Sequence, residues 1–380
     1  MAKIKQIILI CLSFMTFSTN SQELRIGAER TELYLPLLKG NNIAIIANQT
    51  SIIKNTHLVD SLLKLELNII KVFTPEHGFR GEADAGADIE NEIDEKTGLS
   101  IISLYGKNKK PSTKQLEDVD IILFDIQDVG ARFYTYISTL HYVMEAAAEN
   151  NIQVIVLDRP NPNGHYIDGP TRERGFESFV GMHQVPIVHG MTIGEYARMI
   201  NGENWISTKC KLDVIEMKYY THNMHYAIPI RPSPNLPNSR SINLYPSLCL
   251  FEGTSISVGR GTNYPFQHFG APYIISNYSF TPKSGYGSKY PKYENTKCFG
   301  TDLRFQENYL NEINLTWIIN SYNSCTEKEK FFNSFFDKLA GTDKLRMQII
   351  NGKNENEIRK SWKKNLDTFK LVRSKYLLYN

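Results

Sequence analysis

Apolar residues in the first half of the chain come in short continuous runs, and polar residues end each run. Four such runs are "NIAIIANQT" (42–50), "NIIKVFTPEHG" (68–78), "VDIILFDIQD" (119–128) and "IQVIVLDRPNP" (152–162). Runs rich in Ile and Val without alternation are typical of strands buried on both faces, as in a parallel sheet. Helical stretches such as "THLVDSLLKLE" stand between them. This order predicts a doubly wound α/β domain with a mostly parallel sheet.

The clearest predicted helix follows the third run. Its apolar residues, from Phe133 to Ala147, recur at spacings of three and four residues and form one stripe. Asp128 stands where the N-cap of this helix is expected. The last predicted elements of the domain are "VPIVHG", a helix from about Ile193, and "KLDVIEM".

The length of the chain indicates two domains. Its 380 residues exceed what one compact core usually holds, and a hydrophobic content of 41% is ample for a globular fold. The second half has shorter strands, many loops and a helical C-terminal region. We therefore predict an α/β domain over residues 22–222 and a smaller α+β domain over residues 223–380.

Four of the predicted strands end in polar residues that could form one site. In open parallel sheets, ligands bind in the crevice beyond the carboxyl ends of the strands. One acid at a strand end is ordinary, but four strands that end this way predict a binding site. The residues are Asn48 and Gln49, Glu76 and His77, Asp125 and Gln127, and Asp158 and Arg159.

Glu76 is the strongest functional candidate among these residues. Pro75 before it and Gly78 after it interrupt any helix, so helix capping explains the glutamate poorly. The glycines of "EHGFRGEADAG" allow tight turns and a close approach of the backbone to a ligand.

Other acids have a structural interpretation beside the functional one. Asp158 could pair with Arg159 or cap the turns of "RPNPNG", and Glu252 lies in a glycine-rich loop, so both interpretations stay open. Thr192 and Glu195 fit a capping box, and Glu195 is therefore assigned to structure.

Several common functions lack their sequence signatures. No GxGxxG follows the first strand, and the GxxxxGK[ST] and GxSxG motifs are missing. A net charge of +3 without a dense basic patch argues against nucleic-acid binding. The histidines match no common metal-ligand spacing, so we expect neither a metal nor another cofactor. Four cysteines beyond Cys11 allow three full disulfide pairings, and no spacing selects one.

Eight segments, in order, resemble one bacterial family. They are "FTPEHGFRGEADAG", "SLYG", "DIILFDIQDVGARFYTYISTL", "VLDRPNPNG", "GMTIGE", "PSPNLPN", "EGTSISVGRGTNYPF" and "GAPY". The family is that of the exo-β-N-acetylmuramidases, peptidoglycan hexosaminidases formerly catalogued as a domain of unknown function. The resemblance runs from about residue 27 to residue 352; Asn163 stands where many members carry a more apolar residue.

The resemblance implies a Rossmann-like domain, a smaller C-terminal domain and an active site in the cleft between them. It also implies release of N-acetylmuramic acid from the non-reducing ends of peptidoglycan fragments, and it places the family's catalytic glutamate on Glu76. Glycoside hydrolysis usually needs two carboxyl groups, and Asp125 and Glu252 are candidates for the second. The acetamido group of the substrate is an alternative nucleophile, so retaining, inverting and substrate-assisted mechanisms all stay open.

The substrate of such an enzyme carries a lactyl carboxylate, which an arginine would bind through paired hydrogen bonds. The arginines available for this contact are Arg80, Arg132, Arg159 and Arg260. The other substrate-binding candidates are Asn48, His77, Gln127, Tyr134, Asp158 and Asn235.

Two other functions stay open at this point. A non-catalytic protein that binds cell-wall saccharides would show binding without turnover, and a metal-dependent hydrolase that uses the histidines would be inhibited by chelators. The sequence predicts no stable membrane insertion, and it is silent on oligomeric state.

The N-terminus predicts export. Lys3 and Lys5 precede the apolar run "IILICLSFMTF", and small polar residues follow, which is the layout of a signal peptide over residues 1–21. The native protein should therefore be found outside the cytoplasm, in the periplasm or secreted, with a new N-terminus near Ser21. Mass spectrometry of the native protein checks this, and an intact Met1 or Ala2 terminus on soluble protein would contradict it.

Overall fold

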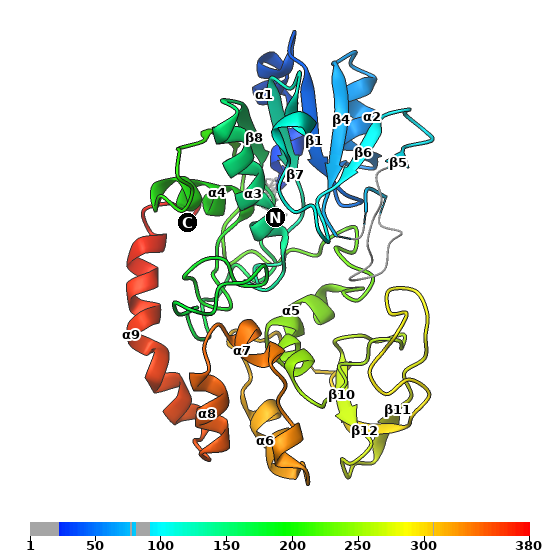
Figure 1. The fold of residues 1–380 in the computed structure, drawn as a ribbon, viewed down its shortest axis with the longest axis vertical. Coiled ribbons are helices and arrows are strands. Elements are labelled where there is room, and N and C mark those ends of the chain that lie inside the picture. Colours follow the sequence, from blue (N-terminus) through cyan, green and yellow to red (C-terminus); the bar gives the residue numbers. More distant parts are fainter. Residues whose placement is uncertain (1–22, 77, 81–91, 307) are drawn as a thin grey trace, which may run out of the picture.

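A seven-stranded sheet forms the core of the first half of the chain (Figure 1). The computed structural model describes residues 23–76, 78–80, 92–306 and 308–380. The strand order is β5-β6-β4-β1-β7-β8-β9, and all neighbours are parallel except the antiparallel edge pair β5 and β6. The strands are β1 (Ile43–Ala47), β4 (Ile69–Thr74), β5 (Glu92–Ile93), β6 (Ser100–Ser103), β7 (Ile121–Asp125), β8 (Gln153–Leu157) and β9 (Lys211–Ile215).

Helices cover both faces of this sheet, because alternate residues of each buried strand point to opposite sides. Ile43 and Ile45 of β1 pack with α1 and α2, whereas Ala44 and Ile46 pack on the other face with α3 and α4. The predicted doubly wound α/β architecture is thus confirmed. The helices are α1 (Thr31–Leu38), α2 (Leu58–Leu63), α3 (Tyr136–Glu149) and α4 (Ile193–Gly202), with the 3₁₀ turns η1 (Gly27–Glu29) and η2 (Thr113–Leu116).

The start of α3 differs from the sequence prediction. Its N-cap is Thr135, seven residues beyond Asp128, and the Asp128 carboxylate instead accepts the Gly130 N–H at 2.7 Å. Burial raises the pKa of Asp128 to about 7. The segment between the strand and the helix is therefore an ordered turn, and Asp128 holds that turn instead of capping the helix.

Two other local predictions have opposite outcomes. The capping box at α4 is confirmed: Thr192 accepts the Glu195 N–H, and the Glu195 carboxylate accepts the Thr192 N–H. The run "VPIVHG" lies outside the sheet, and its Val188 makes isolated bridges to Ala131 and Asp168.

The second half combines a small antiparallel sheet with helices. Its strand order is β10-β12-β11. In Figure 1 the last helix, α9, runs up the side of the molecule, so that the C-terminus lies near α4. The elements are α5 (Ser239–Leu248), η3 (Cys249–Gly253), β10 (His268–Ala271), β11 (Tyr278–Phe280), β12 (Cys298–Asp302), α6 (Thr316–Ser324), η4 (Lys328–Lys330), α7 (Phe335–Ala340), α8 (Lys344–Ile350) and α9 (Glu355–Arg373); the short pair β2 (Ile52–Ile53) and β3 (Thr56–His57) belongs to the first half.

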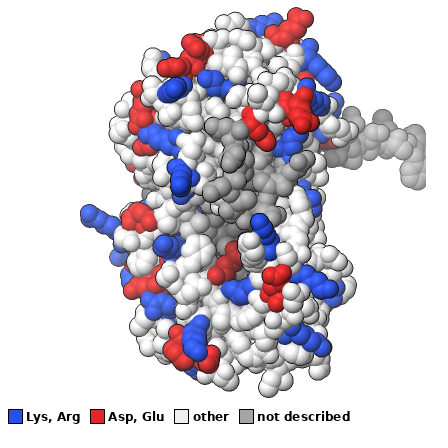
Figure 2. Space-filling view, turned by 45° about the vertical axis from the view of Figure 1, so that its right-hand side comes forward, with Lys and Arg blue, Asp and Glu red and all other residues white. Residues whose placement is uncertain are grey.

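Charges of both signs are mixed on the surface in view, and the cysteines are buried. Figure 2 shows acidic and basic side chains interspersed over the face in view. Within the described part of the chain, no helix has the length and apolar character needed to cross a membrane. The four cysteines in that part, Cys210, Cys249, Cys298 and Cys325, are all buried and none is in a disulfide.

Candidate active site

A cavity of about 480 Å³ opens between the sheet domain and the second half of the chain. Pockets that bind small ligands typically have volumes of about 300–1,000 Å³. The first half of the chain contributes the end of β4 and the segments 133–135 and 179–180. The second half contributes α5, η3, α7 and three loops, at 233–236, 260–266 and 287–290, so the cavity lies where the two halves meet.

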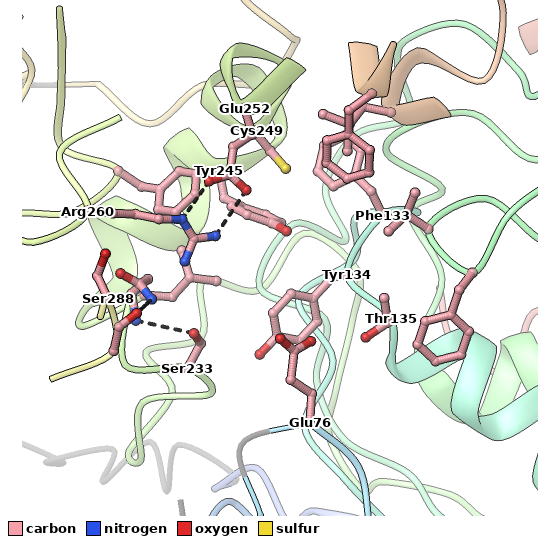
Figure 3. Close-up of a pocket in the computed structure, with 18 of the residues that line it drawn as sticks. Glu76, Phe133, Tyr134, Thr135, Ser233, Tyr245, Cys249, Glu252, Arg260 and Ser288 are labelled. Atoms are coloured by element: carbon pink, nitrogen blue, oxygen red, sulfur yellow. Dashed lines mark hydrogen bonds and ion pairs between the residues drawn. The ribbon is translucent and has the colours of Figure 1, made fainter. Parts of the chain in front are cut away.

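Glu76 reaches the cavity because a tight turn follows β4. The N–H of Gly78 bonds to the carbonyl of Pro75 at 3.3 Å, and Gly78 has a φ of +76°, which favours glycine. Glu76 is half-buried, and Figure 3 shows its carboxylate pointing towards Tyr134 at the centre of the cavity.

Glu252 and Arg260 form an ion pair on the opposite wall (Figure 3). Nε and Nη2 of Arg260 donate to the two Glu252 oxygens at 2.5 and 3.0 Å. Burial opposes the charge on Arg260, but the Glu252 carboxylate outweighs it and raises the pKa of the guanidinium. Gly259 and Gly261 both have positive φ, so the chain turns sharply on each side of Arg260.

Lys292 fixes the segment that carries Glu252. Its ammonium group donates to the carbonyls of Thr254 and of Ile256, the latter at 3.0 Å, just after Glu252 in the chain. Burial lowers the pKa of Lys292 to about 8, and the negative charge of Glu252 works against that decrease. Glu252 therefore lies in a segment that a buried cation holds in place.

Aromatic rings form a rigid lining across the domain boundary. Tyr245 of α5 makes edge contacts with Phe133, Tyr134 and Phe266, with ring centroids 5.1–5.9 Å apart. The Tyr134 hydroxyl donates to the carbonyl of Pro232 at 2.8 Å. Such rings offer flat apolar faces against which a sugar ring can stack.

Comparison with known proteins places the chain in a family. The family models "Exo-beta-N-acetylmuramidase NamZ, N-terminal" and "Exo-beta-N-acetylmuramidase NamZ, C-terminal" match residues 43–240 and 243–379. The chain belongs to the NamZ exo-β-N-acetylmuramidase family. It is 41% identical over 377 residues to the peptidoglycan β-N-acetylmuramidase NamZ of Bacillus subtilis, covering 91% of this chain and 89% of the relative.

Two solved structures from Bacteroides fragilis, both DUF1343 family proteins, share the fold. One has a TM-score of 0.88 and 46% identity, and the other has a TM-score of 0.79 and 29% identity. Each comparison covers 94% of this chain and 99% of the solved chain. The family resemblance seen in the sequence is thereby confirmed over nearly the whole length.

Only some of the residues predicted for the NamZ-family site line this cavity. Those that do are Glu76, Tyr134, Asn235, Glu252 and Arg260. Asn235 also joins two loops of the wall, because its side-chain amide donates to the carbonyl of Gly287 at 2.7 Å. His77 lies outside the described residues.

Asp125 and Arg159 are paired with each other at the carboxyl ends of β7 and β8. Both are fully buried, and Nε and Nη2 of Arg159 donate to the two Asp125 oxygens at 2.6 and 2.8 Å. Arg159 Nη2 also donates to the carbonyl of Ile52 at 3.1 Å. Neither side chain lines the cavity, and the two charges neutralise one another, so the position of this pair favours a structural role over the predicted site role.

The polar residues next to this pair are likewise part of the scaffold. The Asn48 amide donates to the Tyr136 hydroxyl at 2.9 Å, and the Gln127 amide donates to the carbonyls of Asp128 and Pro160. Asn48 and Gln127 are buried and hold the strand-end loops together, so their assignment as substrate-binding residues is not supported by their position.

Two of the candidate arginines also have structural partners. Arg132 is fully buried, and its guanidinium donates to the carbonyls of Pro170, Val185 and Leu339 at 2.7–2.9 Å. Arg80 pairs with Asp94 through two 2.8 Å bonds, and this hydrogen-bonded pairing lowers the pKa of Asp94 to about 2. Neither arginine lines the cavity, so their positions favour structural roles over the predicted contact with the substrate.

Asp158 binds the returning C-terminal tail. It accepts hydrogen bonds from the Thr192 and Tyr379 hydroxyls, both at 2.7 Å, and from the Gly194 N–H at 2.8 Å. Burial raises the pKa of Asp158 to about 7. Of the two interpretations of this acid, the structural one fits its position.

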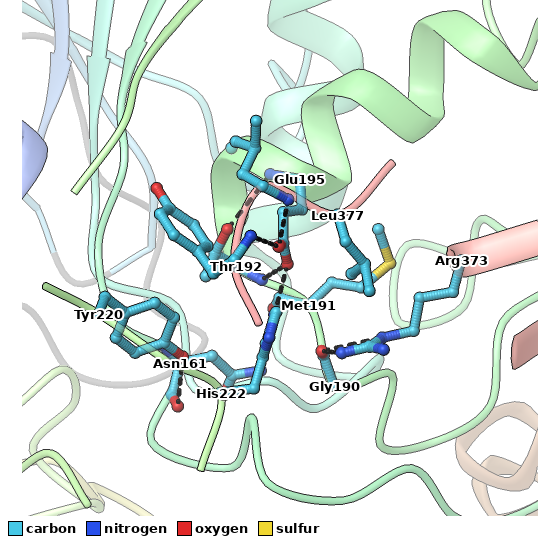
Figure 4. Close-up of polar contacts among 12 residues, drawn as sticks. Asn161, Gly190, Met191, Thr192, Glu195, Tyr220, His222, Arg373 and Leu377 are labelled. Carbon is cyan, nitrogen blue, oxygen red and sulfur yellow. Dashed lines mark hydrogen bonds and ion pairs between the residues drawn. The ribbon is translucent and has the colours of Figure 1, made fainter. Parts of the chain in front are cut away.

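Glu195 lies at the centre of the same tail contact, away from the cavity (Figure 4). One carboxylate oxygen accepts the N–H groups of Leu378 and Tyr379, and the other contacts the His222 ring at 2.9 Å. Arg373, at the end of α9, donates to the carbonyl of Gly190. The tail thus ties the end of the second half back onto the sheet domain.

Sequence reasoning missed several residues of the wall. The cavity is also lined by Tyr245, Ser288, Lys289 and Tyr290. Lys292 does not line it but donates to the carbonyl of Ile256 in the segment after Glu252. Apart from Tyr245, these residues lie in one loop rich in Gly, Lys and Tyr, a composition that is equally typical of an ordinary surface loop. Within the described ranges, no group of three or more His, Cys, Asp or Glu side chains is placed to hold a metal ion.

Replacing Asp125 tests whether it belongs to the scaffold. Asp125→Asn leaves the buried Arg159 guanidinium without its anion, and the free energy of unfolding should fall by roughly 3–5 kcal/mol. Urea denaturation measures this, with the exposed acid Asp118→Asn as the control that changes little. An unchanged free energy of unfolding would return Asp125 to the candidates for the second carboxyl group.

Replacing Glu195 tests the tail contact. Glu195→Ala removes the acceptor of two tail N–H groups, so the protein should lose at least about 1.5–3 kcal/mol of stability. Hydrogen exchange at Leu378 and Tyr379 should accelerate, which mass spectrometry of C-terminal peptides would detect. The exposed Glu216→Ala is the matched control, and protection of the tail amides in Glu195→Ala would refute this role.

Proposed function

We propose that this protein is a glycosidase that releases N-acetylmuramic acid from the non-reducing ends of peptidoglycan fragments. The observation that carries the proposal is the position of Glu76 and Glu252 on opposite walls of an aromatic cavity in a chain of the NamZ family. The Bacillus subtilis relative is a peptidoglycan β-N-acetylmuramidase, which supports the same substrate.

Glu76 is proposed as the general acid. The proton of its carboxyl group passes to the glycosidic oxygen as the bond between that oxygen and the anomeric carbon breaks. A water molecule then adds to the anomeric carbon and gives a proton to Glu76 if the configuration is retained, or to the second carboxylate if it is inverted. Half-burial at the end of an apolar strand gives Glu76 the partly dehydrated setting that such proton transfer favours.

Glu252 is proposed as the second carboxyl group. Arg260 holds the Glu252 side chain through two hydrogen bonds, and a carboxylate stabilises the positive charge that develops on the sugar ring in the transition state. The configuration of the first-formed product, followed by NMR, distinguishes retention from inversion.

Cationic side chains of the cavity wall are proposed to bind the lactyl carboxylate. Arg260 and Lys289 both line the cavity, whereas Arg80, Arg132 and Arg159 do not. The pairing of Arg260 with Glu252 uses its Nε and Nη2 groups, so its Nη1 edge is the part that a substrate carboxylate would contact.

Export is part of the same proposal. Peptidoglycan lies outside the cytoplasmic membrane, and the signal-peptide layout of residues 1–21 agrees with a substrate in that location. The N-terminus of the native protein tests this point.

The released sugar tests the proposed reaction directly. Mature protein is incubated with a muramyl-terminated disaccharide and, separately, with a glucosaminyl-terminated one, and the products are identified. N-acetylmuramic acid should appear only from the first. Saccharide binding without release would favour a non-catalytic binder, and loss of activity with a chelator would favour a metal-dependent hydrolase.

Glu76→Gln tests the general acid. The amide keeps the shape of the side chain but has no transferable proton, so kcat should fall about 10²–10⁴-fold. Binding of the intact disaccharide and the Tm should change little. Glu92→Gln, an exposed glutamate of the same domain, is the control. Near wild-type turnover in Glu76→Gln would show that another group is the acid, and unfolding would show that Glu76 is structural.

A further inference from the structure

A second cavity, of about 630 Å³, lies on the sheet domain beside the first. It contains neither Glu76 nor Glu252, and the proposed reaction does not use it. Its wall combines aromatic rings with histidines and one lysine. The residues that matter here are Lys109, His141, Tyr142, Phe179, His183 and Trp205.

Three separate segments line both cavities. Phe179 belongs to both walls, and the loop after β6 places Tyr105 in the first cavity and Lys109 in the second. The N-cap of α3, Thr135, lines the first cavity, and Tyr142 further along the helix lines the second. Because these three segments contribute to both walls and Phe179 is shared, the two cavities are adjacent.

The lining of the second cavity is aromatic and ordered. The rings of Tyr142 and Phe179 are nearly parallel, at 15°, with centroids 6.2 Å apart, and the Lys109 ammonium lies 4.7 Å from the Phe179 centroid. His183 stacks on Trp205 at 4.1 Å. Half-buried rings held in this way present flat apolar faces at low entropic cost.

Hydrogen bonds fix the histidines of this wall. The His183 ring contacts the His141 ring and the Tyr196 hydroxyl, each at 2.9 Å. Burial lowers the pKa of both histidines, so both rings are neutral near pH 7. Arg172, also on this wall, is paired with Glu177. The wall is therefore mostly uncharged, which suits a neutral sugar better than an acidic peptide.

We propose that the second cavity binds the saccharide units on the leaving-group side of the cleaved bond. This inference rests on the proposed function. An enzyme that removes the terminal sugar holds that sugar in the first cavity, so the rest of the glycan leaves along the adjacent surface. The ligand class is a chain of N-acetylated amino sugars, whose apolar ring faces stack on Tyr142 and Phe179.

Kinetics on two chain lengths test the inference. Wild-type protein should have a higher kcat/KM for a muramyl-terminated tetrasaccharide than for the disaccharide. In Tyr142→Ala the ratio of the two kcat/KM values should fall about tenfold, because a stacking contact is lost only with the longer chain. Lys109→Ala is a second variant, and Phe305→Ala, an exposed aromatic outside both cavities, is the control.

A binding measurement separates this inference from the proposed function. Calorimetry with the tetrasaccharide compares Glu76→Gln with the double variant Glu76→Gln/Tyr142→Ala, and the Tm of each confirms folding. About tenfold weaker binding by the double variant supports the inference even if no sugar is released. Equal binding, or an unchanged kinetic ratio in both Tyr142→Ala and Lys109→Ala, overturns it. Failure of the wild type to release N-acetylmuramic acid from either substrate overturns the proposed function instead.

Discussion

The buried guanidinium of Arg132 is the contact on which the site most depends. Its two terminal nitrogens donate to the carbonyls of Pro170 and Val185 in the first half and of Leu339 in the second, and no carboxylate among the described residues is paired with it. A buried charge that lost these acceptors would be costly, so the geometry around it is strongly fixed. The next residues in the chain, Phe133 and Tyr134, line the cavity, and so does Leu339 itself. One side chain therefore both shapes one wall and holds the opposite half of the chain against it.

Other contacts between the halves reinforce this arrangement at the edges. The tail returns from α9 to bind Glu195 and Asp158 on the sheet domain, and Tyr134 bonds to the carbonyl of Pro232 in the connection to α5. These contacts hold the two halves of the chain together, and the one at Tyr134 lies at the cavity wall itself.

Two carboxylate–arginine pairs in this part of the molecule differ in how deeply they are buried. At the sheet edge, the Asp125–Arg159 pair is fully buried and mutually neutralised, so it supports the strand ends without presenting charge to a ligand. The Glu252–Arg260 pair has the same chemistry but lies at a partly exposed wall, where a ligand can reach it. A carboxylate–arginine pair therefore supports the fold where it is fully buried, and it can contact a ligand where it is partly exposed.

The sequence by itself determined the architecture and singled out Glu76, which lies in the cavity wall. The apolar runs predict strands because burial on both faces requires uniform hydrophobicity, and Pro75 and Gly78 mark Glu76 as a turn residue at a strand end. These are local signals, so they need no knowledge of distant partners. Only the tertiary structure decided which other polar residues share the site. Asp125 meets Arg159 across 34 positions, and Arg132 meets Leu339 across 207. Such pairings depend on how elements pack, which leaves no local trace in the chain. The cap expected at Asp128 was wrong for a local reason: an Asp before a helix is consistent with a cap or with a turn, and here the Asp128 carboxylate accepts the Gly130 N–H in the turn that precedes Thr135.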